Sequence, residues 1–134
     1  MFSTWQGLLG FFGIVCATFF LVFVWLQGRR SKGGNGEENA LHRIWVKIFA
    51  GTLLLGVLGV EGMVRLHGGW WDTSWLAWLH MTFVVFASTL FMLIYFRFTG
   101  LRHPALHAPF AYTFILVYGG MLITGGVLLS RFPN

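Results

Sequence analysis

The chain has 134 residues, of which 57% are hydrophobic and only 10% are charged, and its mean hydropathy is +0.73. Soluble domains contain about 25% charged residues, so this chain cannot cover itself with a polar surface. Its net charge of +5 comes from basic residues placed between apolar segments. That placement is typical of topology determinants and anionic-lipid contacts, so we expect a lipid bilayer as partner and no nucleic acid.

Four apolar segments follow one another along the chain, at residues 8–26, 44–66, 76–96 and 109–129. Each is close to the ~20 helical residues that cross a ~30 Å hydrocarbon core. In lipid, a spanning segment must satisfy its own backbone hydrogen bonds, which favours a helix over an open strand. The sequence therefore predicts an all-α, integral membrane four-helix bundle with short loops, in a single domain covering residues 1–134.

The three connections differ in composition. Residues 28–40 contain Gly-Gly-Asn-Gly with Arg, Lys and Glu, which predicts a solvated loop. Pro109 follows the third connection, residues 97–108, and is expected in the first turn of the last helix, where its missing N–H costs nothing. The second connection, residues 67–75, is rich in tryptophan, which is typical of the headgroup boundary. Its tryptophans and the next one along the chain are Trp70, Trp71, Trp75 and Trp78.

The basic residues predict an orientation. Seven of the nine lysines and arginines flank the first and third connections: Arg29, Arg30, Lys32, Arg43, Lys47, Arg97 and Arg102. Since basic residues are enriched in cytoplasmic loops, we expect both of these connections in the cytoplasm and both termini outside it.

Small residues predict close helix packing. Gly56, Gly59 and Gly62 recur every three residues in the second segment. Such a stripe is typical of a helix–helix seam, because small residues let two backbones approach. The alternative is a groove that admits a flat ligand, such as a porphyrin or a quinone ring. Similar spacings are Gly13-x3-Ala17 and Gly120-x3-Thr124. The one cysteine, Cys16, cannot form an intrachain disulfide and is expected to be a small packing residue.

Glu61 and Arg65 are four residues apart near the end of the second segment. At this spacing two helical side chains share a face, so the two charges can pair. One interpretation is a structural ion pair at the membrane edge. The other is a proton or quinone site, since carboxylates within the membrane often have such roles.

Five histidines could carry chemistry as a set: His42, His67, His80, His103 and His107. A six-coordinate b-type haem in a membrane bundle needs two neutral imidazoles from different helices at matching depth. Histidines at a membrane boundary are also common as interfacial residues without a ligand. The sequence leaves both interpretations open.

His80 is the best single candidate for an iron ligand, because it lies inside the third segment. It shares a helical stripe with Phe83, Val84 and Ala87. His67, at the end of the second segment, could oppose it across the short connection. At the other membrane face, His107 could oppose His42.

Other catalytic signatures are absent from the sequence. It has no Cys-x-x-Cys, no Cys-x-x-Cys-His, no Gly-x-Ser-x-Gly and no Walker motif. Its four acidic residues are too scattered for a carboxylate-bound di-metal centre. We therefore assign no catalytic residues; the sequence leaves open whether the chain is an enzyme and favours a non-catalytic role.

The C-terminal half, roughly residues 75–130, resembles small histidine-bearing bacterial membrane families. The residues that carry the resemblance are Leu79-His80-Met81, residues 90–97 (Leu-Phe-Met-Leu-Ile-Tyr-Phe-Arg), His107-Ala108-Pro109 and residues 119–125 (Gly-Gly-Met-Leu-Ile-Thr-Gly). They are similar to SirB-like and CopD-like proteins and, more distantly, to the cytochrome b561 type. The resemblance implies His80 and His107 as haem or metal ligands, and a bacterial inner membrane.

The leading hypothesis from the sequence is a small membrane subunit associated with electron transfer that binds haem b through histidines and contacts other membrane subunits. One alternative is a structural accessory subunit without a cofactor. Another is a permeation protein for metal ions or small solutes, built from two or four copies.

Overall fold

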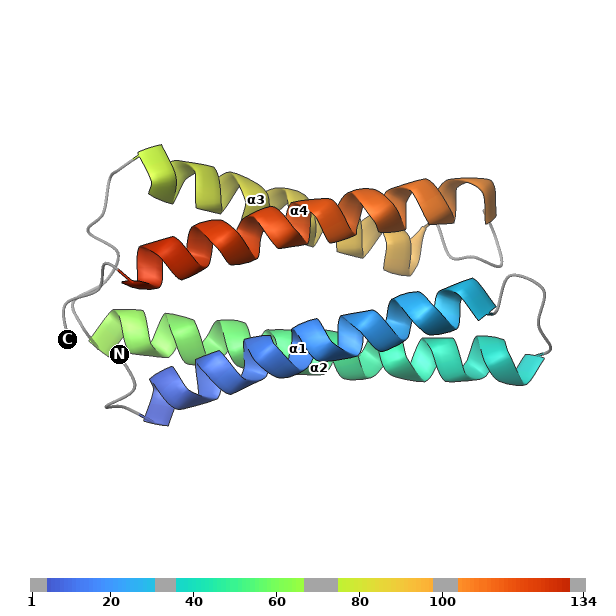
Figure 1. Ribbon diagram of the computed structural model, residues 1–134, viewed down its shortest axis with the longest axis horizontal. Coiled ribbons are helices and arrows are strands. Elements are labelled where there is room, and N and C mark those ends of the chain that lie inside the picture. The colour runs from blue at the N-terminus through green and yellow to red at the C-terminus, as the bar shows by residue number, and fades with distance from the viewer. Residues whose placement is uncertain (1–4, 31–35, 67–74, 98–103, 131–134) are drawn as a thin grey trace. The chain divides into compact units, whose positions relative to one another are not determined.

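The computed structural model describes residues 5–30, 36–66, 75–97 and 104–130, and these form four helices. They are α1 (Trp5–Arg30), α2 (Gly36–Leu66), α3 (Trp75–Phe96) and α4 (Pro104–Ser130) (Figure 1). Each is long and apolar enough to cross a membrane. The all-α class and the four membrane-length helices of the predicted bundle are thus confirmed, and with them an integral membrane protein whose apolar helices contact lipid.

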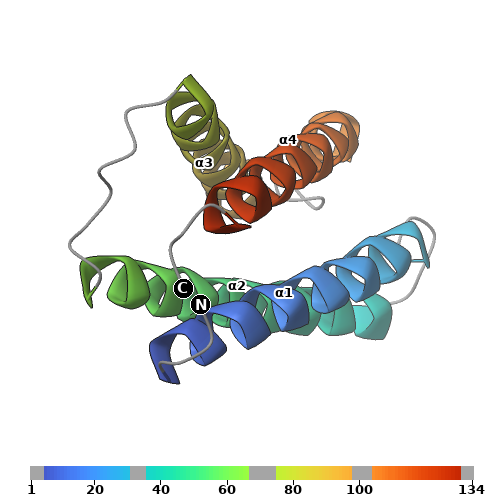
Figure 2. The same cartoon turned by 60° about the vertical axis from the view of Figure 1, so that its left-hand side comes forward.

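The chain divides into two compact units, Met1–Trp70 and Trp71–Asn134. In the first unit α1 and α2 lie side by side and antiparallel, and in the second unit α3 and α4 do the same (Figures 1 and 2). Each unit is therefore a helical hairpin. The single domain expected from the sequence stays a prediction.

The first predicted loop is shorter than residues 28–40. Residues 28–30 belong to α1, and α2 begins at Gly36, eight residues before the predicted start at residue 44. Glu37 and Glu38 occupy the first turn of α2. Acidic side chains there interact favourably with the positive end of the helix dipole, so a polar segment extends the helix beyond its apolar part.

The expected position of Pro109 was wrong. α4 begins at Pro104, so Pro109 lies inside the helix. The reason is that residues 105–108, Ala-Leu-His-Ala, include three good helix formers and continue the helix toward the N-terminus. Pro104 takes the first position, where no N–H is needed. Pro109 has no N–H to donate to the carbonyl of Ala105. Only this one helical hydrogen bond is lost, and it lies in the first turn of α4.

Close backbone contact holds the first hairpin together. A Cβ atom added at Gly13 would lie 2.5 Å from the Cα of Gly56, and one added at Gly10 would lie 2.7 Å from the backbone nitrogen of Val60. Both Gly56 and Gly59 are buried. The predicted seam is therefore confirmed at Gly56, where the backbone of α1 occupies the space that a flat ligand would need.

An aromatic cluster continues the same contact toward the connection between α1 and α2. The indole of Trp45 stacks on Phe20, with 5.8 Å between ring centroids, and on Phe23, with 5.1 Å. Because lipid is as apolar as these side chains, the rings stabilise the α1–α2 contact by dispersion and not by removal of apolar surface from water.

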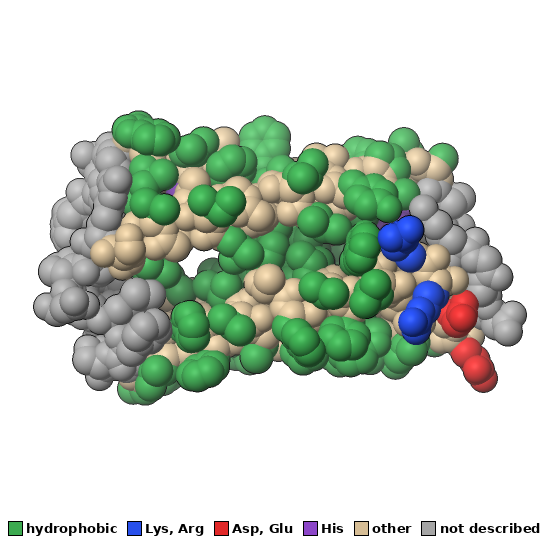
Figure 3. Space-filling model, in the orientation of Figure 1, with side chains coloured by type: hydrophobic (Ala, Val, Ile, Leu, Met, Phe, Trp, Pro, Cys, Tyr) green, Lys and Arg blue, Asp and Glu red, His purple; other side chains and the backbone are tan. Residues whose placement is uncertain are grey.

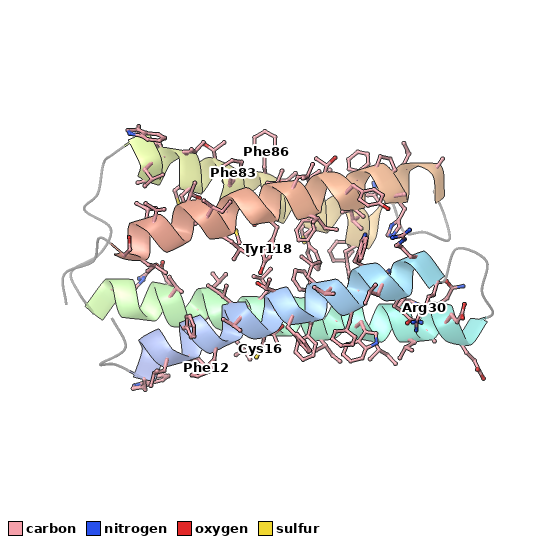
Figure 4. The ribbon with its side chains drawn as sticks, in the orientation of Figure 1. Phe12, Cys16, Arg30, Phe83, Phe86 and Tyr118 are labelled. Carbon is pink, nitrogen blue, oxygen red and sulfur yellow. The ribbon has the colours of Figure 1, made fainter. Side chains whose placement is uncertain are left out.

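Most of the helical surface is apolar and exposed, as expected for side chains that face lipid. Figure 3 shows hydrophobic side chains along the length of α1, while charged side chains lie at the end where α1 ends and α2 begins. Phe12 and Cys16 both point outward from α1 (Figure 4), and both are exposed. The expectation of Cys16 as a packing residue was wrong: its neighbour Ala17 is fully buried instead.

Candidate functional site

The second hairpin is aligned by two side chains of α3 that fit against glycines of α4. A Cβ atom at Gly120 would lie 2.9 Å from the Cε1 of Phe83, and one at Gly125 would lie 2.9 Å from the Cε1 of His80. Ala87, on the same stripe, is buried, whereas Phe86 points outward (Figure 4). The stripe of His80, Phe83 and Ala87 predicted from the sequence is therefore the face of α3 that packs against α4.

His80 makes a hydrogen bond across this hairpin. Its Nδ1 lies 3.0 Å from the hydroxyl oxygen of Thr124, whose side chain is buried. The same hydroxyl lies 2.8 Å from the carbonyl of Gly120, to which it can donate, and 3.2 Å from that of Met121. The imidazole itself is half-buried. His80 is thus held by a neighbouring helix inside a membrane-length segment.

The other candidate ligands lie elsewhere. His42, in α2, is half-buried, and its Cε1 would be 3.1 Å from a Cβ atom at Gly28 of α1. His107 is half-buried in α4. His67 and His103 fall outside the described residues. His42 and His107 belong to different units, as His67 and His80 do. Both proposed pairs of iron ligands stay predictions.

The tryptophans at the start of α3 are strongly exposed, Trp75 by 75% and Trp78 by 71%. Trp78 precedes His80 by two residues, or about 200° around a helix, so it points away from the face that packs against α4. Such exposure suits the anchoring at the headgroup boundary expected from the sequence. Trp70 and Trp71 lie outside the described residues.

The predicted pair of Glu61 and Arg65 is formed. The Nε of Arg65 donates to a carboxylate oxygen of Glu61 at 2.8 Å, and both side chains are exposed, by 77% and 44%. In water such i,i+4 pairs contribute about 0.3–0.5 kcal/mol. The geometry favours the structural interpretation, because the two charges pair with each other and both side chains are exposed.

Within the four described ranges, no three His, Cys, Asp or Glu side chains gather into a group that could hold a metal ion. A haem iron needs only two axial ligands from the protein, so this finding leaves the haem hypothesis as it stands.

Sequence reasoning missed Thr124 and Gly125 as partners of His80. A signal was present: only residues 97–103 separate α3 from α4, so the first turns of α3 must meet the last turns of α4. The Gly120-x3-Thr124 spacing then marks the face of α4 that α3 can approach. The spacing alone does not say which residue of α3 meets which glycine.

Comparisons with protein families, with curated proteins and with solved structures found no match to this chain.

Proposed function

We propose that the protein is a small, non-catalytic integral membrane subunit associated with electron transfer, in which His80 is an axial ligand of a b-type haem. The observation that supports it is the hydrogen bond of 3.0 Å between His80 Nδ1 and Thr124. Histidines that bind metal through one ring nitrogen are commonly oriented by a hydrogen bond at the other. The haem, when bound, supplies one-electron redox chemistry; the chain holds and orients it.

The second ligand that we propose for the haem iron is His67, which a short connection separates from α3 in the sequence. The pair of His42 and His107 is the corresponding proposal for the opposite membrane face. Partner subunits in the membrane would deliver or accept the electron, since the residues that the structure describes all belong to the four membrane-length helices or their ends.

The test of this function is the optical spectrum of the protein purified after expression with added haem. We expect a Soret band and a reduced-minus-oxidised α band, both lost in His80→Ala and both kept in His103→Ala, the matched histidine control. In His80→Gly, added imidazole should restore the bands, because it can occupy the vacated ligand position.

A colourless wild-type protein, or a His80→Ala variant with unchanged bands, would overturn the assignment. The colourless result favours an accessory subunit without a cofactor. Uptake of ions or small solutes by proteoliposomes would instead favour the permeation hypothesis.

We propose further that the connections after α1 and after α3 face the cytoplasm and that both termini lie outside it, in a bacterial inner membrane. Arg29 and Arg30 close α1, and the Arg29 guanidinium lies 5.1 Å from the ring centroid of Trp25. A cation beside an indole is well suited to the headgroup level.

Cysteine labelling tests this orientation. In a Cys16→Ala background, which has no other thiol, a reagent that cannot cross the membrane should label Ser3→Cys and Thr73→Cys from outside. It should label Ser31→Cys only after the membrane is permeabilised. The reverse pattern would invert the assignment of membrane faces.

A further inference from the structure

The hydroxyl of Thr124 has one proton and several neighbours that could share it. The carbonyl oxygens of Gly120 and Met121 lie 2.8 and 3.2 Å from it, and both can only accept a hydrogen bond. The Nδ1 of His80, at 3.0 Å, can donate or accept according to its tautomer. The position of the hydroxyl proton therefore decides whether Thr124 donates to His80 Nδ1 or accepts from it.

Threonine hydroxyls elsewhere in the described helices give the pattern. Thr18, Thr52 and Thr113 each donate to the carbonyl four residues earlier, at 2.8–2.9 Å. Thr124 has the same geometry toward Gly120. Once the proton points at that carbonyl, only lone pairs of the oxygen remain for His80, so the imidazole must donate.

From this geometry we infer that Thr124 is the positioning residue of the His80 site: it holds the imidazole with the proton on Nδ1 and the lone pair on Nε2. Nε2 is then the atom whose lone pair is available to bind a metal such as haem iron. The inferred tautomer of His80 rests on the hydrogen bonds alone. Only the role of Nε2 toward iron rests on the proposed function.

Gly125 completes the arrangement. A Cβ atom there would lie 2.9 Å from Cε1 of His80, 3.4 Å from Nδ1 and 3.7 Å from Nε2. The Cε1 edge of the ring therefore faces the backbone of α4, with one nitrogen on each side. A larger residue would crowd this edge of the ring, so glycine permits the contact between His80 and Thr124.

The tautomer can be measured without haem, by the nitrogen-15 NMR shifts of the His80 ring, which separate a protonated from an unprotonated ring nitrogen. The sample is full-length haem-free protein with labelled histidine at alkaline pH, and His80 is identified from the spectrum of His80→Ala. We expect a proton on Nδ1 in the wild type. Thr124→Val, of nearly the same shape, should shift the population toward the other tautomer, and Thr124→Ser should restore it. Thr113→Val on the same helix is the control and should change nothing.

If haem binds, Thr124→Val should also weaken its affinity about 10–100-fold, the usual effect of removing a group that orients a metal-binding histidine. A wild-type proton on Nε2, or a Thr124→Val spectrum identical to the wild type, would overturn the inference. The two proposals fail separately. A colourless protein with the Nδ1 proton defeats only the haem assignment, and a haem-binding protein insensitive to Thr124→Val defeats only the positioning role.

Discussion

Replacing Gly13 with alanine is expected to destabilise the α1–α2 hairpin, although alanine favours a helix more than glycine does. The new methyl carbon would lie 2.5 Å from the Cα and 2.6 Å from the nitrogen of Gly56. Both atoms belong to a helix backbone, so the two helices must separate along the whole seam. Overpacking typically costs about 1–3 kcal/mol, and a contact with backbone belongs at the upper end.

The matched control is Gly51→Ala, because a Cβ atom at Gly51 has nothing within 4 Å. Alanine there gains up to about 1 kcal/mol in helix propensity, and less if the separated helices stay helical in the membrane. Denaturation with SDS of protein in mild detergent should give a lower midpoint for Gly13→Ala and an unchanged or higher one for Gly51→Ala. Equal midpoints would mean that α1 and α2 do not meet at Gly13.

Gly125→Ala is the second substitution with a large expected effect, and it acts through His80. Its methyl carbon would lie 2.9 Å from Cε1 of the imidazole, so the ring must turn or move away. Turning the side chain off its rotamer costs about 0.5–1.5 kcal/mol, and losing the Thr124 hydrogen bond costs a similar amount. We expect the α3–α4 hairpin to lose about 1–3 kcal/mol of stability by these two contributions.

The adjacent residue supplies the control. Gly126 has no atom within 4 Å of an added Cβ, so Gly126→Ala, like Gly51→Ala, should leave the stability unchanged or slightly higher. The same SDS denaturation gives the stability of both variants, and the NMR shifts of His80 report whether the ring has moved. A Gly125→Ala variant with wild-type stability and wild-type ring shifts would contradict the packing of His80 on α4.

The two hairpins share one packing arrangement. In each, a histidine ring near the start of one helix lies against a glycine near the end of the neighbouring helix. In the first hairpin these are His42 and Gly28, and in the second they are His80 and Gly125. Antiparallel helices with short connections make this arrangement available, since the start of one helix meets the end of the other. Of these two histidines, only His80 lies within a predicted apolar segment, residues 76–96.

The sequence by itself determined the features that depend on local interactions. Composition and the four apolar runs predict the all-α membrane class, because the thickness of the hydrocarbon core sets the length of a spanning helix. The Glu61–Arg65 pair follows from helical spacing alone, and so does the shared face of His80, Phe83 and Ala87. Helix ends were less well predicted, because polar residues such as Glu37 and Glu38 can extend a helix beyond the apolar segment.

The small-residue spacings indicated contact faces at Gly13-x3-Ala17 and Gly120-x3-Thr124, but only the tertiary structure decided which residues of two neighbouring helices meet. A helix surrounded by lipid is apolar on every side, so its sequence has no polar face to mark the outside, as a soluble helix would. This is why Cys16 was wrongly expected inside the contact, although the predicted Gly13-x3-Ala17 spacing is confirmed by the full burial of Ala17, one residue on. The partners of His80 were undetermined for a related reason. Thr124 and Gly125 are more than forty residues away from His80. That both meet the ring depends on how α3 and α4 align, and this alignment involves the fit of Phe83 against Gly120 as well as that of His80 against Gly125.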